Sequence, residues 1–412
     1  MRYFITLPLI LILSLPTYSQ STTDWTEISD NVPGDLPDGN FTDVYFIGDE
    51  GWITFDELYN NHGAILYTDN AGMSFTILTV PEVPNVIEMI DAGKGFAGCL
   101  SGNVYYTNDG GVQWKLLSGS LGSEIYGIDA LADPLMGYAC GEYGYISIFD
   151  TNQVYPPDQP FSPWYNQIDM LDIEFPIDSN EGWVCGEYMI GHYHYGTWDS
   201  LNAPQCRRYY SLCFINSDTG WSTGGQGMVM TPVITNTTDG INWNWQSHPL
   251  IDQWLYDIYF IDKDWGWSVG MYILSTIDGG ETWVKEAQNY GNTWYALHAV
   301  DSSAVYVVGR NKRILKRDII ISLEELQISR ILNTYPNPFK VHTTLEYELS
   351  TSSNIQFTIY NNTGREVFRI EEKYELSGHH SILLSLYHLP SGLYYGVLKS
   401  DKEVCIVKMV KR

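Results

Sequence analysis

Three acidic residues, Glu88, Asp129 and Glu174, stand at equivalent positions in three consecutive copies of a repeated pattern. Neighbouring carboxylates repel one another, so one of them can keep its proton near neutral pH, or several can hold a cation together. Two carboxylates across a cleft can also hydrolyse a glycosidic bond. The simpler interpretation is that polar residues line a water-filled channel. A shift of one residue in the alignment would turn these side chains to the other face of each strand.

The same alignment assigns equivalent positions in the other copies of the repeat. These positions hold Tyr45, Cys213, Tyr259 and His298. Tyr259 and His298 therefore join the three acidic residues as candidate ligand contacts at one end of the channel.

A second group of possible ligands lies in the segment EYMIGHYHYGTW, which begins at Glu187. Its histidines, His192 and His194, alternate so that both side chains point to one side of a strand. Together with Glu187 they could bind a metal ion, because imidazole and carboxylate are common ligands of zinc. A third ligand with suitable spacing is not evident. We therefore predict no metal site and no cofactor.

The aromatic residues of the same segment suggest a different role. Tyr193 and Tyr195 flank His194, and Trp164 lies in the segment 156–165, which has a similar exposed character. Rings of this kind stack on sugars and pack against peptides. We predict that these loops contact a ligand.

A repeat with a period near 40 residues must position all of these residues. Each copy combines an alternating apolar strand, a short acidic turn and an aromatic anchor. The anchors are Trp52, Phe96, Tyr138, Trp183, Trp221 and Trp267, with Val305 in a worn seventh copy. Short strands at this period are typical of the blades of a β-propeller. We predict an all-β fold with seven blades of four strands each.

Most copies carry a second phrase after the anchor. It reads TDNAGMSF from Thr68, TNDGGVQW from Thr107, TTDGINW from Thr237 and TIDGGETW from Thr276. This phrase resembles the Asp-box, or BNR repeat, in which Gly adopts a positive φ and Asp binds backbone N–H groups of the turn. The third and fourth copies lack a clear box.

The ring is also predicted to close through its ends. The segment Asp24-Trp25-Thr26-Glu27 resembles the tail that follows each box, and the seventh copy ends soon after Leu315 without such a tail. The N-terminal segment should therefore supply the outer strand of the last blade, since closure removes an exposed sheet edge.

The propeller repeats resemble those of photosystem assembly and stability factors and, more distantly, of sialidases. A sialidase clamps its substrate with three arginines, whereas residues 21–309 contain only Arg207 and Arg208. Sialidase activity is therefore excluded. We predict a non-catalytic binding or scaffold module for a protein or a glycan. The alternatives are a glycoside hydrolase that uses the carboxylates of the propeller mouth, and an assembly factor for an envelope complex.

The segment from Thr334 reads as short strands and turns, which predicts a small immunoglobulin-like β-sandwich. Five motifs occur in the order of the type A sorting domain of type IX (Por) secretion, which the segment resembles. They are Tyr335–Phe339, Ile359–Asn361 with Gly364, Gly378-His379, Leu389–Tyr395 and Lys408–Arg412. The resemblance implies a Gram-negative Bacteroidota cell, contact with the secretion machinery and a sortase, and removal of the domain. It implies a secreted or outer-membrane surface location, with release and attachment to the surface after cleavage as the two alternatives.

The N-terminus supports this route. Arg2, a short apolar run and a small residue at Ser19 are typical of a cleaved signal peptide. We divide the chain into a signal peptide (1–19), a propeller (20–318), a linker (319–333) and a sorting domain (334–412).

Charge and cysteines set further limits. Residues 21–320 contain 39 acidic and 11 basic residues within a chain of net charge −27. This balance argues against binding nucleic acid or an anionic membrane. Of the six cysteines, Cys206 and Cys213 could form a disulfide across a short turn; the alternative is that they are buried free thiols.

Overall fold

The computed structural model describes residues 25–318 and 333–412, except for 59, 61, 159–167, 205, 227–230, 251, 287–291, 301–303, 350–351, 362–365, 388 and 401–403. The proposed signal peptide, and the proposed linker apart from Asn333, lie outside the described residues. Trp25–Ile319 forms one compact unit, and the C-terminal segment belongs to another. None of the described helices has the length and apolar character needed to cross a membrane.

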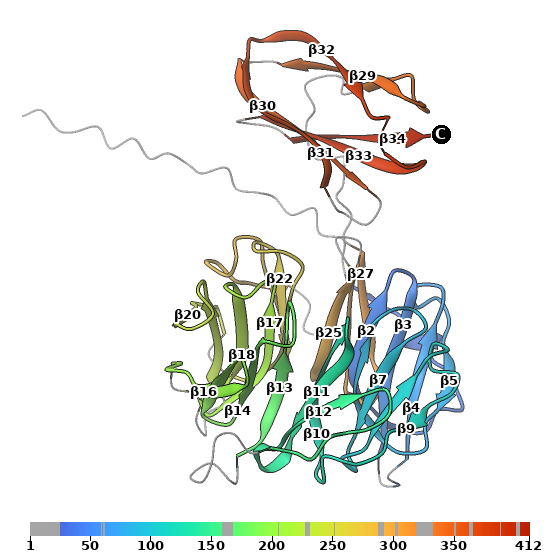
Figure 1. Cartoon of the computed structure of the whole chain (residues 1–412), viewed down its shortest axis with the longest axis vertical. Helices are drawn as coiled ribbons and strands as arrows, with labels where there is room; N and C mark the ends of the chain where they lie inside the picture. Colours follow the sequence, from blue (N-terminus) through green and yellow to red (C-terminus); the bar gives the residue numbers. More distant parts are fainter. Residues whose placement is uncertain are drawn as a thin grey trace, which may run out of the picture. The chain divides into compact units, whose positions relative to one another are not determined.

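The first unit is a seven-bladed β-propeller (Figure 1). Each blade is an antiparallel sheet whose innermost strand lines the central channel. Six blades have the predicted four strands, whereas the sheet of blade 3 has three in the described part of the chain. Blade 1 has β2 (Gly39–Ile47), β3 (Glu50–Glu57), β4 (Gly63–Thr68) and β5 (Thr76–Thr79). Blade 2 has β6 (Pro84–Met89), β7 (Gly95–Cys99), β8 (Val104–Thr107) and β9 (Lys115–Leu116). Blade 3 has β10 (Ile125–Ala132), β11 (Leu135–Gly141) and β12 (Ile146–Asp150).

The strands of blades 4 to 7 follow the same order. Blade 4 has β13 (Met170–Glu174), β14 (Glu181–Gly186), β15 (Met189–His194) and β16 (Thr197–Ser200), and blade 5 has β17 (Arg208–Phe214), β18 (Gly220–Gln226), β19 (Thr231–Thr237) and β20 (Trp243–Trp245). Blade 6 has β21 (Leu255–Phe260), β22 (Gly266–Gly270), β23 (Ile273–Thr276) and β24 (Val284–Lys285). Blade 7 has β25 (Trp294–Val300), β26 (Ala304–Gly309) and β27 (Ile314–Asp318), with β1 (Thr26–Glu27) as its outer strand. Short 3-10 turns occur at Ser29–Asn31, Glu142–Gly144 and Arg310–Lys312.

The strand register confirms the alignment of the repeats for six of the seven copies. Glu88 lies opposite Phe96 and Glu174 lies opposite Trp183, as the alignment predicts. In blade 7, however, His298 lies opposite Tyr306, so the anchor is Tyr306 and the prediction of Val305 was wrong by one residue. The seventh copy lacks the glycine that precedes the anchor in the other copies, so the alignment there was displaced by one residue.

The anchors fasten each blade to the next. Trp183 stacks on Phe214 with ring centroids 4.1 Å apart, and Trp221 stacks on Phe260 at 3.6 Å. The Nε1–H groups of these tryptophans also donate to the backbone carbonyls of Gly240 and Gly279, in turns of the following blade, at 2.7 and 2.9 Å. A single ring therefore joins two sheets by packing and by a hydrogen bond.

The turns that receive these bonds are held by their own side chains. In blade 2, the Thr107 hydroxyl accepts the Gly111 N–H at 2.8 Å, and Asp109 accepts the N–H of Gln113 at 2.9 Å. Gly110 and Gly111 have φ values of 73° and 91°, which other residues adopt at a cost.

We predict that Trp221→Phe destabilises the propeller by about 1 kcal/mol, because it removes the bond to Gly279 and keeps the ring stack. Thermal unfolding measures the change. The matched control is Trp267→Phe, since the buried Nε1 of Trp267 has no hydrogen-bond partner in the described part of the chain and should lose little. Equal losses in both variants would contradict the role assigned to the bond.

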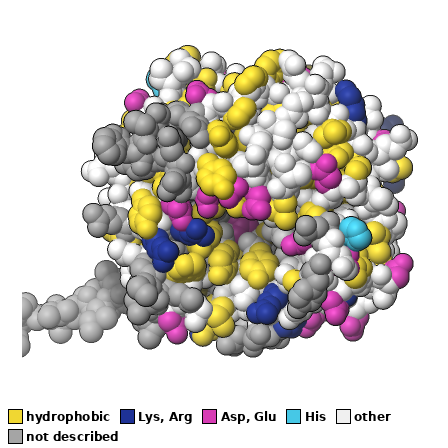
Figure 2. Space-filling model, turned by 90° about the horizontal axis from the view of Figure 1, so that it is seen from below, with side chains coloured by type: hydrophobic (Ala, Val, Ile, Leu, Met, Phe, Trp, Pro, Cys, Tyr) yellow, Lys and Arg dark blue, Asp and Glu magenta, His cyan; other side chains and the backbone are white. Residues whose placement is uncertain are grey.

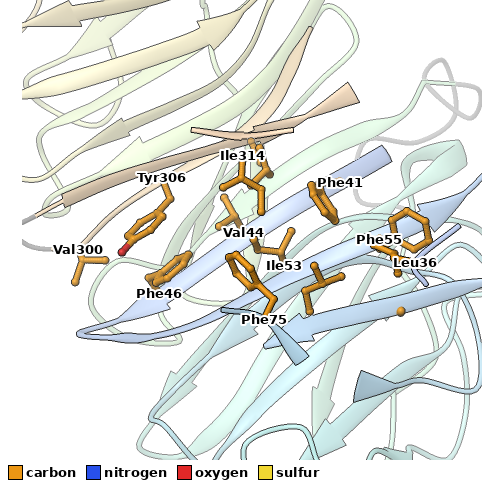
Figure 3. Close-up of a cluster of buried hydrophobic side chains, with 14 of the residues drawn as sticks. Leu36, Phe41, Val44, Phe46, Ile53, Phe55, Phe75, Val300, Tyr306 and Ile314 are labelled. Atoms are coloured by element: carbon orange, nitrogen blue, oxygen red, sulfur yellow. The ribbon is translucent and has the colours of Figure 1, made fainter. Parts of the chain in front are cut away.

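The ring closes as predicted. β1 pairs with β27 in antiparallel register, with Thr26 opposite Lys316 and Glu27 opposite Leu315. On the other side of this blade, Tyr306 stacks on Phe46 of blade 1 at 3.6 Å and donates its hydroxyl to Ala71 at 3.1 Å (Figure 3). Blade 7 thus contacts blade 1 through the same kind of contact that joins the other blades.

The second unit is a β-sandwich. One sheet has the order β28 (Asn333–Tyr335), β29 (His342–Leu349), β32 (Gly378–Ser385); the other has β31 (Glu366–Glu375), β30 (Ser353–Asn361), β33 (Gly392–Ser400), β34 (Val404–Lys411). Alternate residues of these strands, among them Leu345, Phe357 and Leu398, fill the core between the sheets.

The five cysteines of the propeller have free thiols in this structure. Cys206 and Cys213 are both buried, and no disulfide joins them. The Cys206 thiol contacts the carbonyls of Arg208 and Gly225, whereas that of Cys213 accepts the N–H of Phe260. The alternative of buried free thiols is therefore the one that the structure has.

Candidate functional site

The innermost strands of all seven blades surround one cavity of about 220 Å³. Six of the seven positions predicted to be equivalent line it together, and Cys213 is the exception. The six are Tyr45, Glu88, Asp129, Glu174, Tyr259 and His298. Figure 2 shows acidic side chains gathered at the centre of one face of the molecule, with hydrophobic side chains around them. The channel is therefore the place where the sequence-predicted residues Glu88, Asp129 and Glu174 come together.

A bulge near the start of each inner strand shapes the channel mouth. In β17 the register shifts between Tyr209 and Ser211, and β21 and β25 shift at the corresponding place. Such a bulge turns one extra side chain out of the regular alternation. The extra residues include four tyrosines that line the cavity: Tyr126, Tyr210, Tyr256 and Tyr295. We call these four residues the tyrosine collar.

Three of the four collar tyrosines contact one another in a row at the mouth. The rings of Tyr210 and Tyr256 lie 5.1 Å apart, and those of Tyr256 and Tyr295 lie 5.8 Å apart. All four are only partly buried, so part of each residue is accessible to a ligand. The sequence did not predict the collar, because the alignment assumes regular alternation along each inner strand and has no place for a bulged residue. The available signal was a tyrosine three residues before the aligned channel position in four copies of the repeat.

Most of the channel carboxylates have a structural partner in the next blade. Asp43 accepts the N–H of Ile87, Asp172 that of Leu212, and Asp257 that of Leu297, at 2.7 to 2.8 Å. Asp129 and Glu174 accept the N–H groups of Phe175 and Phe214 in the same way, at 2.5 and 2.7 Å. The inner strand is the open edge of each sheet, so these carboxylates cover backbone donors that would otherwise lack a partner.

Glu88 is different from the other carboxylates. Its side chain accepts a hydrogen bond from the Tyr45 hydroxyl. Within the described part of the chain, no backbone N–H group donates to it in the way seen for Asp129 and Glu174. Glu88 therefore caps no strand edge and is the acidic group in the channel with the weakest structural role.

The channel favours protonated carboxyl groups. Burial raises the pKa of Asp43 to about 7 and that of Asp172 to about 8, against opposing backbone hydrogen bonds. Burial, and then the nearby carboxylates, raise the pKa values of Glu88 and Glu174 well above their ordinary range. At neutral pH several of these groups therefore hold protons, so the channel carries less negative charge than its number of carboxyl groups suggests.

His298 and Tyr259 lie against each other within the channel. The His298 ring is 4.8 Å from that of Tyr259 and 4.5 Å from that of Tyr45. Burial lowers the pKa of His298 to about 3, so its imidazole is neutral at physiological pH. A neutral ring packed between two phenols offers a polar contact to a ligand without adding charge.

The loop residues predicted in blade 4 have separate surroundings. Tyr193 packs against Trp198 and Phe175, with ring centroids 5.1 and 5.6 Å away, whereas Tyr195 is 74% exposed. Trp164 lies outside the described residues. Glu187, which we considered as a metal ligand, is instead 2.6 Å from the Arg208 guanidinium.

Known proteins match each of the two units separately. Residues 333–412 match the family model of the secretion system C-terminal sorting domain. The C-terminal unit is a sorting domain of this family, and it indicates export by type IX secretion to the cell surface or the extracellular space. A search of curated protein sequences gave no significant match.

Solved structures resemble the propeller. YCF48 from Cyanidioschyzon merolae is 15% identical with a TM-score of 0.56, over 71% of this chain and 98% of that chain. Virginiamycin B lyase from Staphylococcus aureus is 13% identical with a TM-score of 0.56, over 72% and 99%. U3-55K is 7% identical with a TM-score of 0.56, over 72% and 98%. At these identities the likeness shows the fold alone, and a fold does not determine activity.

Proposed function

We propose that the protein is an exported binding module that holds a protein or glycan ligand at the tyrosine collar, without catalysing a reaction. The carrying observation is the collar itself: four partly exposed tyrosines lie at equivalent positions around the mouth of one cavity. Rings of this kind bind sugars and peptides with little loss of conformational freedom.

The chemistry inside the channel supports binding more than hydrolysis. Hydrolysis needs one carboxyl group as an acid and another as a base or nucleophile, both free to reach the substrate. Asp129 and Glu174 are engaged with the backbone of the next blade, and Glu88 is engaged with Tyr45. These contacts suit a fixed channel wall.

The binding site can be tested with the secreted protein on a glycan array and in a pull-down from the outer envelope. Once a ligand is found, Tyr256→Ala should weaken its binding about tenfold, because Tyr256 touches both neighbouring collar tyrosines. Tyr155→Ala is the control, since Tyr155 is 42% exposed and does not line the channel. Equal binding by both variants would refute the collar as the site.

The same glycan experiment distinguishes binding from enzyme activity. Release of new reducing ends from a bound glycan, abolished by Glu88→Gln, would support the glycoside hydrolase alternative and contradict the binding proposal. Recovery of one envelope complex, with no glycan bound, would favour the role of an assembly factor, which is a binding function in the same class.

Export has its own test. We propose that residues 1–19 are a cleaved signal peptide, that a sortase removes the sorting domain, and that the producing cell is a Gram-negative member of the Bacteroidota. Deleting residues 334–412 should leave the propeller in the periplasm, as measured by fractionation and immunoblotting. Normal secretion of the truncated protein would overturn this part of the proposal.

A further inference from the structure

Blade 4 carries a group of metal-binding side chain types that the channel does not use. Glu181 lies on β14, and His192 and His194 lie on β15. One donor atom from each lies within 4.8 Å of the others. In the described part of the chain, no other group of three His, Cys, Asp or Glu side chains meets this criterion.

The sheet itself brings the three side chains together. His192 and His194 alternate along β15 and so share one face of the sheet. Glu181 lies directly opposite His194 in the register of β14 and β15, which places its carboxylate on the same face. Three ligands from two adjacent strands therefore meet without any contribution from a loop.

The distances suit a small cation. The Glu181 Oε1 atom is 3.2 Å from His192 Nε2 and 3.8 Å from His194 Nδ1. Two ligands that bind zinc tetrahedrally at about 2.1 Å lie roughly 3.4 Å apart. The donor atoms of the two imidazoles lie within 4.8 Å of each other, so the exposed His194 ring would rotate toward His192 to complete that geometry.

The surroundings give one rigid ligand and an open side. His192 is 9% exposed, and its ring stacks on Trp183 at 4.9 Å. Trp183 is fixed in turn by its hydrogen bond to Gly240. The side chains of His194 and Glu181 are 54% and 35% exposed, so a fourth position faces solvent.

A comparison with blade 1 separates a metal site from an ordinary polar pair. There, Glu50 and Tyr67 occupy the positions of Glu181 and His192, and the Tyr67 hydroxyl donates to Glu50 at 3.0 Å. One donor satisfies that carboxylate. In blade 4 two imidazoles converge on one carboxylate, which is the donor set of open zinc sites.

We propose that Glu181, His192 and His194 bind one divalent transition-metal ion, with zinc as the expected ion and water in the fourth position. Calcium and magnesium require oxygen ligands and do not match two imidazoles. Nickel and copper share the preference for imidazole, so they should compete with zinc. The site is separate from the tyrosine collar, and its test does not depend on the ligand proposed there.

The test is calorimetric titration of the intact, chelator-treated protein with Zn²⁺ near pH 7.5. We expect about one equivalent of zinc to bind, and His194→Gln and Glu181→Gln each to weaken binding at least tenfold. Both side chains are partly exposed, so these variants should keep the metal-free melting temperature of the wild type.

The matched control is His62→Gln. His62 lies 3.3 Å from Glu57 but has no second histidine in that pair, so its loss should leave zinc binding unchanged. The proposal is wrong if the wild type binds no zinc, or if both blade 4 variants bind as the wild type does. It is also wrong if binding is lost instead in Glu88→Gln, which would place the ion in the channel.

Discussion

Removing residues 25–31 should prevent the propeller from folding stably, although these residues form only one short strand. The segment supplies β1, the outer strand of blade 7, and without it the edge of β27 is exposed. Several further bonds fix it: the Ile28 N–H donates to Ile314 at 3.0 Å, and Glu27 pairs with Arg313 at 2.7 Å. The Asn31 side chain also donates to Gly72 of blade 1 at 2.7 Å.

A point substitution isolates the packing part of this effect. Trp25 is 6% exposed and packs in one cluster with Leu315, Val307 and Trp294. Trp25→Ala should lower the free energy of unfolding by about 3–5 kcal/mol, the usual cost of deleting a buried aromatic side chain. Urea unfolding followed by tryptophan fluorescence and circular dichroism measures the loss.

Trp245→Ala provides the control for the fluorescence change and for the loss of one tryptophan. Trp245 also lies on an outer strand, β20, but it is 51% exposed, so its removal should cost well under 1 kcal/mol. If the two variants were equally stable, the N-terminal strand would not be part of the closure, and the deletion should then be tolerated as well.

The sequence could predict the repeats and the closure because both depend on local signals. The aromatic anchors recur at a regular distance, and the tail at Trp25 matches the tails inside the other blades. Each anchor also sets the register of its inner strand, which is why the channel positions of Glu88 and Glu174 were correctly aligned. The alignment failed only at Tyr306, where the local signal is weak.

Contacts between blades and strands could not be predicted in the same way. The capping of Leu212 by Asp172 depends on how closely two sheets approach, and one sequence does not contain that distance. Similarly, Glu187 is closer to His192 in the sequence than Glu181 is, but the register of β14 and β15 brings Glu181 to the histidines. Sequence proximity grouped the two imidazoles correctly, but it grouped them with Glu187 instead of Glu181.

The carboxylates of the channel make stability depend on pH in an unusual direction. Their pKa values are raised in the folded protein, to about 7 for Asp43 and about 8 for Asp172, chiefly by burial. Between the ordinary carboxyl pKa and these values, the folded state holds protons that the unfolded chain has released. The free energy of unfolding should therefore fall as the pH rises from about 4 to about 8.

Glu88→Gln should remove part of this dependence. Glutamine cannot ionise, yet its carbonyl can still accept the Tyr45 hydroxyl, and no strand edge loses its cap. The variant should be more stable than the wild type at pH 8.5, because the wild type must ionise a buried carboxyl group whose pKa is raised by burial, or keep it protonated against the solution pH. At pH 4.5, where Glu88 is protonated in the folded wild type, the two proteins should be almost equally stable.

Glu50→Gln is the matched control, because Glu50 also accepts a tyrosine hydroxyl but does not line the channel. It should give no gain at pH 8.5. A loss of stability for Glu88→Gln at pH 8.5, with none at pH 4.5, would mean that the Glu88 carboxylate is ionised and held by a positive partner. The channel would then be a cation site, and its acidic residues would act as ligands as well as caps for the inner strands.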